Sequence, residues 1–570
     1  MYTASTALLE TLRGADVSYI FANFGSDHPA LIEAIAEARA EGKPIPEIIT
    51  CPNEMVALSA AHGYAQVTGR AQAVVVHVEC GTQSLAGAVH NAAKARVPVF
   101  IFAGTSPFTQ EGELKGSRNE FIQWIQDVPD QRGIVRQYMK YDNELRSARN
   151  LPQIVLRALQ IAHSDPKGPV YIVGAREVME EPVSPIQFDP DQWSSVGFTA
   201  LRANDAAEMA GRLSQARRPL LVTSYFGRRP GEVAGLVKLC RRIGMGVLES
   251  VPSCVNYPHD DELYQGNQWN EPRQNPALAE ADVILVLDSD VPWIPTVSRP
   301  AENAWIYHID VDPLKPSTPL WYIGALSRFQ ADAGIAVGQL NAYLDGKAAD
   351  PEVVEERRRH YAARHHERAA RLAAREAPDG KVITPEFLTA CLRRQLGDDW
   401  IVLNEGITNY AVICDHMARS RPGSMIASGG GSLGWSGGAA IGVKLAHPPY
   451  NVAVLTGDGS YMFSQPSTVH WMARRYKTPF LQVIYNNRGW KAPKLSTLAF
   501  HPDGHASRAE DIGLSFDPPP DHARIAKAAG GAYARMLKDP AEVEAGIAEA
   551  IKVVCEEGRA AVLDCWLAPL

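Results

Sequence analysis

The feature that most constrains the fold is a rhythm that recurs three times along the 570 residues: short apolar runs separated by longer amphipathic segments. Runs of about four to eight apolar residues between helical segments are typical of buried parallel strands joined by crossover helices. A single hydrophobic core stops growing near about 250–300 residues, so a chain of this length divides into several domains. The sequence therefore predicts an α/β fold of three tandem domains, each with a parallel sheet flanked by helices.

Two interruptions of this rhythm set the predicted domain boundaries. Residues 1–184 form the first predicted domain, and a stretch rich in Pro, Ser and Asp separates it from a middle domain at residues 196–343. Residues 344–382 contain the strongly charged segment EERRRHYAARHHERAARLAARE, which predicts a solvent-exposed helical linker. The third domain is predicted at residues 383–570.

Charge and composition exclude several classes of function. The formal net charge is −8 with both signs interspersed, so no basic surface for nucleic acid is expected. No segment approaches the about 20 apolar residues of a membrane span, and the N-terminus lacks a signal-peptide pattern, so we expect a cytoplasmic protein without a membrane partner. The eight cysteines are scattered without a C-x-x-C pair, which argues against a zinc site or a disulfide scaffold.

Two glycine-flanked polar motifs follow apolar runs in the third domain. The sequence GDGS at residues 457–460 follows the run 451–456, and NNRG at residues 486–489 follows the run 480–485. A carboxylate and an amide oxygen are ligands that Mg²⁺ prefers, and glycines let backbone N–H groups approach a diphosphate. Two ordinary turns are the alternative interpretation.

With these motifs the chain resembles the thiamine-diphosphate-dependent enzymes of the acetolactate synthase and pyruvate decarboxylase superfamily, whose signature is GDG followed by NN. The resemblance covers essentially the whole chain and implies two cofactors, thiamine diphosphate and Mg²⁺. It implies that the Asp458 carboxylate, the Asn487 side chain and the Gly489 carbonyl bind the metal. The residues that it places at the diphosphate are Gly457, Gly459 and Ser460.

Two further motifs match the same family. Glu54 precedes GYAQVTG at residues 63–69, and the resemblance implies that its carboxyl holds the cofactor's aminopyrimidine in the imino tautomer that removes the thiazolium proton. In GGGSLGW at residues 429–435, it implies that the Gly431 carbonyl accepts from the 4-amino group and that Leu433 wedges between the two rings. Without the resemblance, a surface Glu and a G-x-G-x-x-G dinucleotide fingerprint are the alternatives.

The sequence NEGITN at residues 404–409 follows another apolar run. The resemblance places this loop over the diphosphate, with Gly406, Thr408 and Asn409 as the candidate contacts. The residues NEG are closer to the corresponding motif of oxalyl-CoA decarboxylases and 2-hydroxyacyl-CoA lyases than to that of acetolactate synthases.

Substrate contacts are expected in the first domain. Where the family usually has F-G-x-P-G, this chain carries Asp27 and His28. A histidine that titrates near neutral pH suits proton transfer, whereas a helix N-cap with a neighbouring imidazole is the structural alternative. Gln126 stands in an I-Q-D sequence that is similar to the family's F-Q-E, which implies that it faces a neighbouring subunit's cofactor.

The resemblance implies an enzyme, a lyase or transferase that makes or breaks a carbon–carbon bond next to a carbonyl. A 2-keto acid decarboxylase or carboligase similar to acetolactate synthase is the preferred hypothesis, and a 2-hydroxyacyl-CoA lyase or an oxalyl-CoA decarboxylase-like enzyme is the alternative. A non-catalytic fold relative and an NAD-dependent oxidoreductase are more distant alternatives. The expected partner is a small molecule: a 2-keto acid, an aldehyde or an acyl-CoA.

Assembly and the middle domain also follow from the resemblance. It implies a homodimer or homotetramer with active sites at the subunit interface, because the carboxyl and the metal motif then meet across a subunit boundary. The middle domain binds FAD or ADP in some relatives. Arg228 and Arg229 are the candidates for a nucleotide phosphate, and a solvated turn is the alternative.

Overall fold

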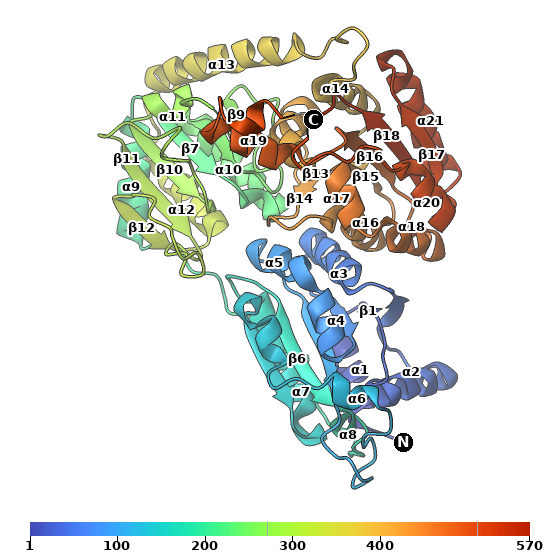
Figure 1. Cartoon of the computed structure of the whole chain (residues 1–570). Coiled ribbons are helices and arrows are strands. Elements are labelled where there is room, and N and C mark those ends of the chain that lie inside the picture. Colours follow the sequence, from blue (N-terminus) through green and yellow to red (C-terminus); the bar gives the residue numbers. More distant parts are fainter. Residues whose placement is uncertain (271, 510) are drawn as a thin grey trace.

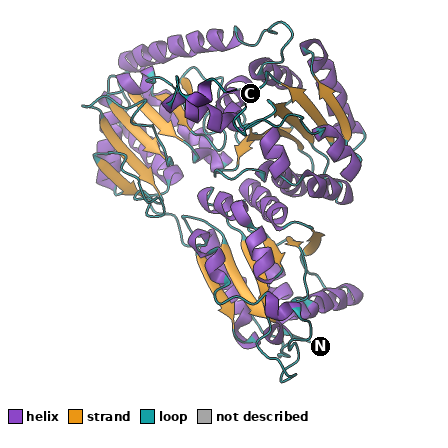
Figure 2. Ribbon diagram, viewed as in Figure 1, coloured by secondary structure: helices purple, strands orange, loops and turns teal. Residues whose placement is uncertain are grey.

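The computed structural model describes residues 1–270, 272–509 and 511–570, and within them the chain forms three six-stranded parallel sheets (Figure 1). Helices cover the faces of each sheet (Figure 2). The prediction of three tandem α/β domains with parallel sheets is therefore confirmed. The residue numbers given above for the domain boundaries stay a prediction.

The first sheet is built from strands β1 (Tyr19–Ala22), β2 (Glu47–Thr50), β3 (Ala73–Val76), β4 (Phe100–Thr105), β5 (Tyr141–Leu145) and β6 (Val170–Ala175). Its helices are α1 (Ala4–Gly14), α2 (Pro29–Glu41), α3 (Glu54–Thr68), α4 (Val78–Ser84), α5 (Ala86–Lys94), α6 (Ile122–Ile125), α7 (Leu151–His163) and α8 (Arg176–Met179). The strand order is β2-β1-β3-β4-β6-β5. Consecutive apolar residues, such as the fully buried AVVV of β3, suit a strand that is covered on both faces.

The middle sheet contains β7 (Pro219–Thr223), β8 (Gly246–Ser250), β9 (Tyr264–Gln268), β10 (Val283–Leu287), β11 (Trp305–Asp310) and β12 (Ser327–Gln330). The surrounding helices are α9 (Ala203–Gln215), α10 (Val233–Ile243), α11 (Pro276–Glu280) and α12 (Ala333–Gly346). The order β12-β11-β10-β7-β8-β9 changes direction between β7 and β10.

Helix α13 (Pro351–Ala373) runs along the middle domain toward the third domain (Figure 1). The sequence predicts solvent on all its sides, but Arg357 and Tyr361 are buried. The Arg357 guanidinium donates to the backbone carbonyls of Ile243, at 2.8 Å, and Ser214, at 2.9 Å, so this arginine anchors the helix. No helix among the described residues has the length and apolar composition that crossing a bilayer requires.

The third sheet contains β13 (Trp400–Glu405), β14 (Met425–Ala427), β15 (Asn451–Gly457), β16 (Leu481–Asn486), β17 (Tyr533–Leu537) and β18 (Ala561–Trp566). Its helices are α14 (Pro385–Gln395), α15 (Tyr410–Met417), α16 (Trp435–Ala446), α17 (Asp458–Phe463), α18 (Pro466–Arg475), α19 (Lys491–Phe500), α20 (His522–Gly530) and α21 (Val543–Glu556). The order β14-β13-β15-β16-β18-β17 repeats the winding of the first sheet strand by strand.

The first and third domains pack against each other through α3 and α16, which face one another in Figure 1. Small residues let the two backbones touch: a Cβ atom on Gly442 would lie 1.9 Å from the Ala60 carbonyl oxygen. A Cβ atom on Gly63 would lie 2.4 Å from the carbonyl oxygen of Ala439. Buried residues of both helices belong to one apolar cluster, so the two domains share a core.

Candidate active site

Three polar side chains of the first domain follow neighbouring strands of its sheet. Asn23 comes after β1, Glu54 begins α3 after β2, and His77 comes directly after β3. The order β2-β1-β3 makes these strands neighbours, and all of them are parallel. Because ligands bind at the carboxyl ends of parallel strands, this edge is the expected place for catalytic groups.

The Glu54 carboxylate is held in a defined position at this edge. Glu54 is 8% exposed and stands in the first turn of α3, where the helix dipole favours a negative charge. Its Oε1 accepts a hydrogen bond from Asn23 Nδ2 at 2.9 Å, and Asn23 is its one hydrogen-bond partner among the described residues. A Cβ atom on Gly81 would lie 3.2 Å from the same Oε1, so that glycine leaves the carboxylate room.

Asp27, His77 and Gln126 form a hydrogen-bonded row beside Glu54. His77 Nδ1 lies 2.6 Å from Asp27 Oδ1, and His77 Nε2 lies 3.1 Å from Gln126 Oε1. The hydrogen bond with Asp27 raises the pKa of His77 above its usual value, despite opposing burial. Burial alone would raise the pKa of Asp27, but the imidazoles of His28 and His77 lower it below its usual range. The row therefore favours an imidazolium paired with a carboxylate.

His28 and His77 both contact Asp27, but their exposure differs. His28 Nδ1 is 2.8 Å from Asp27 Oδ1, and the His28 side chain is 1% exposed, against 21% for His77. His28 is also the N-cap residue of α2, without a side-chain capping bond. The accessible imidazole is thus His77, which the sequence reasoning missed. Its position directly after the apolar run AVVV was the signal that could have found it.

The polar motifs of the third domain follow three neighbouring strands in the same way. Gly406 comes after β13, Asp458 after β15 and Asn487 after β16. Asp458 joins the two predicted metal motifs, since its Oδ2 accepts from the Gly489 backbone N–H at 3.1 Å. Its Oδ1 accepts from the Gly459 N–H at 3.0 Å. Burial raises the pKa of Asp458 to about 6, although these backbone hydrogen bonds lower it.

The surroundings of Asp458 fit a bound cation and a diphosphate. Asn487 Oδ1 and Ser460 Oγ are buried and have no hydrogen-bond partner among the described residues, which is a costly state unless a ligand completes it. Carboxylate and amide oxygens suit Mg²⁺. A Cβ atom on Gly459 would lie 2.3 Å from the Trp490 ring, so this position has no room for a side chain. The carbonyl of Gly489, the third predicted ligand, accepts from Lys491 N at 3.1 Å.

The loop with Gly431 and Leu433 is held from two sides. Glu405, at the end of β13, accepts hydrogen bonds from the backbone N–H groups of Trp435 and Ser436, at 3.0 and 2.9 Å, and so caps the start of α16. Burial raises the pKa of Glu405, and these donors lower it. Gly431 is exposed and Leu433 is half-buried. The sequence reasoning did not single out Glu405.

The first domain holds the same loop from its other side. Gly431 N donates to His90 Nε2 at 3.1 Å. Asn91 Oδ1 accepts from Ser432 N at 3.0 Å, and Asn91 Nδ2 donates to the Ser432 carbonyl at 2.9 Å. Both of these residues belong to α5, so the first domain orients the residues that the resemblance places at the cofactor rings.

Backbone strain gathers at the predicted site. Val78 after His77, Ile407 between Gly406 and Thr408, and Arg488 between Asn487 and Gly489 have φ values of 29°, 54° and 60°. Non-glycine residues adopt this region rarely, β-branched ones least of all, and such strain clusters at functional sites. The turn at Ile407 is closed by Asn409 N, which donates to the Gly406 carbonyl at 3.0 Å.

The structure thus assembles two clusters. One contains Asp27, His28, Glu54 and Gln126 with His77, and the other contains the motifs at residues 406–409, 457–460 and 486–489. Among the described residues, no hydrogen bond or ion pair joins Glu54 to Asp458 or Asn487. The roles of all these residues stay predictions.

Family models match all three domains. The N-terminal TPP binding domain of thiamine pyrophosphate enzymes matches residues 2–134, the central domain matches residues 206–318, and the C-terminal TPP binding domain matches residues 406–565. Together with the fold and the two clusters, these matches define an enzyme that works with thiamine diphosphate.

Known relatives agree with this class. An acetolactate synthase large subunit of Lactococcus lactis is 24% identical, covering 97% of this chain and 91% of the relative. A benzoylformate decarboxylase of Pseudomonas aeruginosa is 26% identical over 85% of this chain and 86% of the relative. The solved thiamine diphosphate-dependent 4-hydroxybenzoylformate decarboxylase of Rhodococcus jostii RHA1 has a TM-score of 0.79 at 20% identity, with 100% of both chains covered. The chain belongs to the thiamine-diphosphate-dependent enzymes of the acetolactate synthase and decarboxylase superfamily.

Replacing Asp27 with Asn tests the pairing with His77. The substitution removes the charge that stabilises the imidazolium, so the pKa of His77 falls. If protonated His77 is needed, activity is lost as pH rises through that pKa, and the basic limb of the kcat/KM profile moves to lower pH. Asp16→Asn, at an exposed site in the same domain, should leave the profile unchanged. An unshifted limb in Asp27→Asn would contradict the pairing.

Proposed function

We propose that this enzyme is a 2-keto acid decarboxylase or carboligase. Relatives named acetolactate synthase, benzoylformate decarboxylase and probable 2-ketoarginine decarboxylase support this reaction class. The observation that carries the proposal is the Asp27–His77 pair beside Glu54, because it sets a proton donor at the strand edge where the substrate is expected. Loss of CO₂ leaves an electron pair on carbon, and this carbon has to take up a proton or add to the carbonyl group of an acceptor.

We propose that the third domain binds the cofactor. Asp458 and Asn487 hold Mg²⁺ with the Gly489 carbonyl, and the metal binds the diphosphate. The other proposed contacts are Gly406, Thr408, Asn409, Gly457, Gly459 and Ser460 for the diphosphate, with Gly431 and Leu433 for the two rings. Thiamine diphosphate supplies a nucleophilic carbon for the carbonyl group of the substrate. Its ring also accepts the electron pair that is released when the neighbouring carbon–carbon bond breaks. Asn487 Oδ1 and Ser460 Oγ, which find no hydrogen-bond partner in the described part of the chain, support this placement.

The first domain supplies the groups that move protons. In the proposal, the Glu54 carboxyl shares a proton with the aminopyrimidine ring nitrogen. His77 holds a proton on Nε2, the nitrogen that faces Gln126. Asp27 keeps this imidazole charged and fixes its ring through Nδ1. Gln126 Oε1 accepts from Nε2 until a substrate oxygen replaces it, so His77 is oriented before the substrate arrives.

We further propose a homodimer or homotetramer in which the active site lies at a subunit interface. Phe121 and Ile125, close to Gln126, are 80% and 73% exposed, and exposed apolar side chains near a site favour a covering partner. A second copy of this chain would bring the Glu54 cluster and the metal cluster together. Light scattering on the active enzyme tests this, and a monomer at the assay concentration would contradict it. The cytoplasmic location stays a prediction.

A substrate panel with metal removal tests the reaction class. Free 2-keto acids, aldehydes and 2-hydroxyacyl-CoA thioesters are each offered, and products are identified by mass. We expect a 2-keto acid to be consumed with loss of CO₂ or formation of a new carbon–carbon bond. Activity should disappear after EDTA treatment and dialysis and return with Mg²⁺ and thiamine diphosphate. Turnover of thioesters alone, with every 2-keto acid inert, would overturn the proposal.

A further inference from the structure

The middle domain has its own strand-end crevice. The strand order changes direction between β7 and β10, and ligands of open α/β sheets bind at the carboxyl ends of the strands on either side of such a point. Tyr225 follows β7, Asp288 and Asp290 follow β10, and Asp310 ends β11. This is the place where a nucleotide of the FAD or ADP type is expected.

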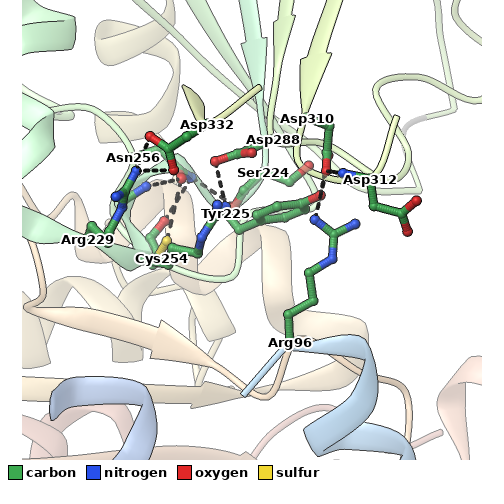
Figure 3. Close-up of polar contacts among 12 residues, drawn as sticks. Arg96, Ser224, Tyr225, Arg229, Cys254, Asn256, Asp288, Asp310, Asp312 and Asp332 are labelled. Carbon is green, nitrogen blue, oxygen red and sulfur yellow. Dashed lines mark hydrogen bonds and ion pairs between the residues drawn. The ribbon is translucent and has the colours of Figure 1, made fainter. Parts of the chain in front are cut away.

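An arginine of the first domain occupies this crevice. Arg96 follows α5 and reaches toward Tyr225 and Asp310 (Figure 3). Its Nη1 lies 2.9 Å from Asp310 Oδ1, its Nη2 lies 3.1 Å from Asp290 Oδ1, and its guanidinium carbon lies 4.8 Å from the centre of the Tyr225 ring. The Arg96 side chain is 11% exposed and the Asp310 side chain is fully buried, so this ion pair is shielded from water, whereas the Asp290 side chain is 42% exposed.

The groups beside Arg96 also have partners within the chain. Lys315 Nζ lies 2.5 Å from Asp310 Oδ2, and the Tyr225 hydroxyl donates to the same oxygen at 2.6 Å. Lys315 also lies 2.7 Å from Asp290 Oδ1. Burial would raise the pKa of Asp310, but Arg96 and Lys315 lower it below its usual range. Asp310, the natural acceptor for a ribose hydroxyl, already has three side-chain donors and the backbone N–H of Asp312.

The arginines of the loop after β7 are also paired with carboxylates within the chain. Arg228 Nη1 lies 2.5 Å from Asp288 Oδ2, and Arg229 Nη2 lies 2.5 Å from Asp332 Oδ2 (Figure 3 shows Arg229 and Asp332). The backbone N–H groups of Ser224 and Tyr225 both donate to the Asp288 carbonyl at 3.1 Å. Arg228 and Arg229, the cations that the sequence offers to a nucleotide phosphate, are therefore already paired with carboxylates of the middle domain.

Although Lys167 and Arg421 line the adjoining cavity of about 310 Å³, the crevice at the strand ends holds more carboxylates than cations among the described residues. Its five carboxylates are Asp288, Asp290, Asp310, Asp312 and Asp332, and its four cations are Arg96, Arg228, Arg229 and Lys315. Asp288 Oδ1 is buried without a hydrogen-bond partner among the described residues, and it would repel a phosphate oxygen. Binding a diphosphate here means breaking buried ion pairs, which leaves uncompensated charges. The paired groups at these strand ends therefore do not suit the diphosphate of FAD or ADP.

We propose that Arg96 takes the place of a nucleotide at the strand ends of the middle domain, where it pairs with Asp290 and Asp310, and that it thereby ties the first domain to the middle domain. Arg96 follows α5 directly, and Asn91 and His90 of α5 hold the loop at residues 431–432. Arg96 is therefore a positioning residue: its ion pairs fix α5, and α5 fixes the loop proposed to contact the cofactor rings.

The first experiment asks what the wild-type enzyme carries and binds. The purified full-length enzyme is denatured, and its supernatant is analysed for FAD, ADP and other nucleotides. FAD and ADP are then titrated into the native enzyme by calorimetry. We expect no flavin absorbance, no released nucleotide and no binding heat. A stoichiometric nucleotide, or ADP binding in the cavity of about 310 Å³ that Arg228 and Arg229 line, would overturn the proposal.

The second experiment tests the positioning role with Arg96→Ala and Arg96→Lys. Arg202→Ala is the matched control, since Arg202 is an arginine paired with Asp205 on the exposed surface of the middle domain. Arg96→Ala should lower Tm by several degrees and weaken the binding of thiamine diphosphate with Mg²⁺ several-fold by calorimetry. Arg96→Lys should recover part of both losses, and Arg202→Ala should match wild type. Wild-type cofactor affinity and Tm in Arg96→Ala would show that Arg96 positions nothing.

Discussion

The close packing of α3 on α16 is the interaction on which the arrangement of the first and third domains depends. At Gly442 and Gly63 a single added carbon would collide with the backbone of the other helix, so these helices have one relative position at this distance. Glu54 begins one of them, and the loop at Gly431 and Leu433 leads into the other. Helix packing therefore sets the orientation of both elements before any cofactor contact is made.

Buried charges organise the remaining geometry. Removing an ion from water costs several kcal/mol unless partners replace the solvent, so each buried carboxylate has to be surrounded by donors. Asp27 uses two imidazoles and the Val78 N–H, Glu405 uses the start of α16, and Asp310 uses Arg96, Lys315 and Tyr225. Among the residues that the structure describes, Asp458 has only backbone donors, and burial raises its pKa to about 6. Asp27 and Asp310 face imidazole or cationic side chains, whereas among the described residues Asp458 has no such partner, which is consistent with the proposed metal site.

The fold and the cofactor motifs could be predicted from the sequence because both are local. Apolar runs mark buried strands, and GDGS, NNRG and NEGITN stand at strand ends, which places Asp458, Asn487 and Gly406 at one edge. Long-range pairing could not be predicted in this way. Asp27 and His77 are separated by two helices and two strands, and Arg96 meets its carboxylates in another domain. The sequence predicts a surface charge at Arg357, because its partners, the carbonyls of Ile243 and Ser214, lie far away along the chain.

The central claim is that Glu54 activates the cofactor that the third domain binds. It is tested most directly by hydrogen–deuterium exchange at the thiazolium carbon of bound thiamine diphosphate, followed by NMR on acid-quenched samples of wild type and Glu54→Gln. Gln keeps the size of the side chain but cannot exchange the proton, and removing a positioned acid–base group costs about 100- to 10,000-fold in rate. We expect Glu54→Gln to fold, to bind the cofactor and to lose nearly all hydrogen–deuterium exchange at the thiazolium carbon. Wild-type exchange and turnover in Glu54→Gln would contradict it.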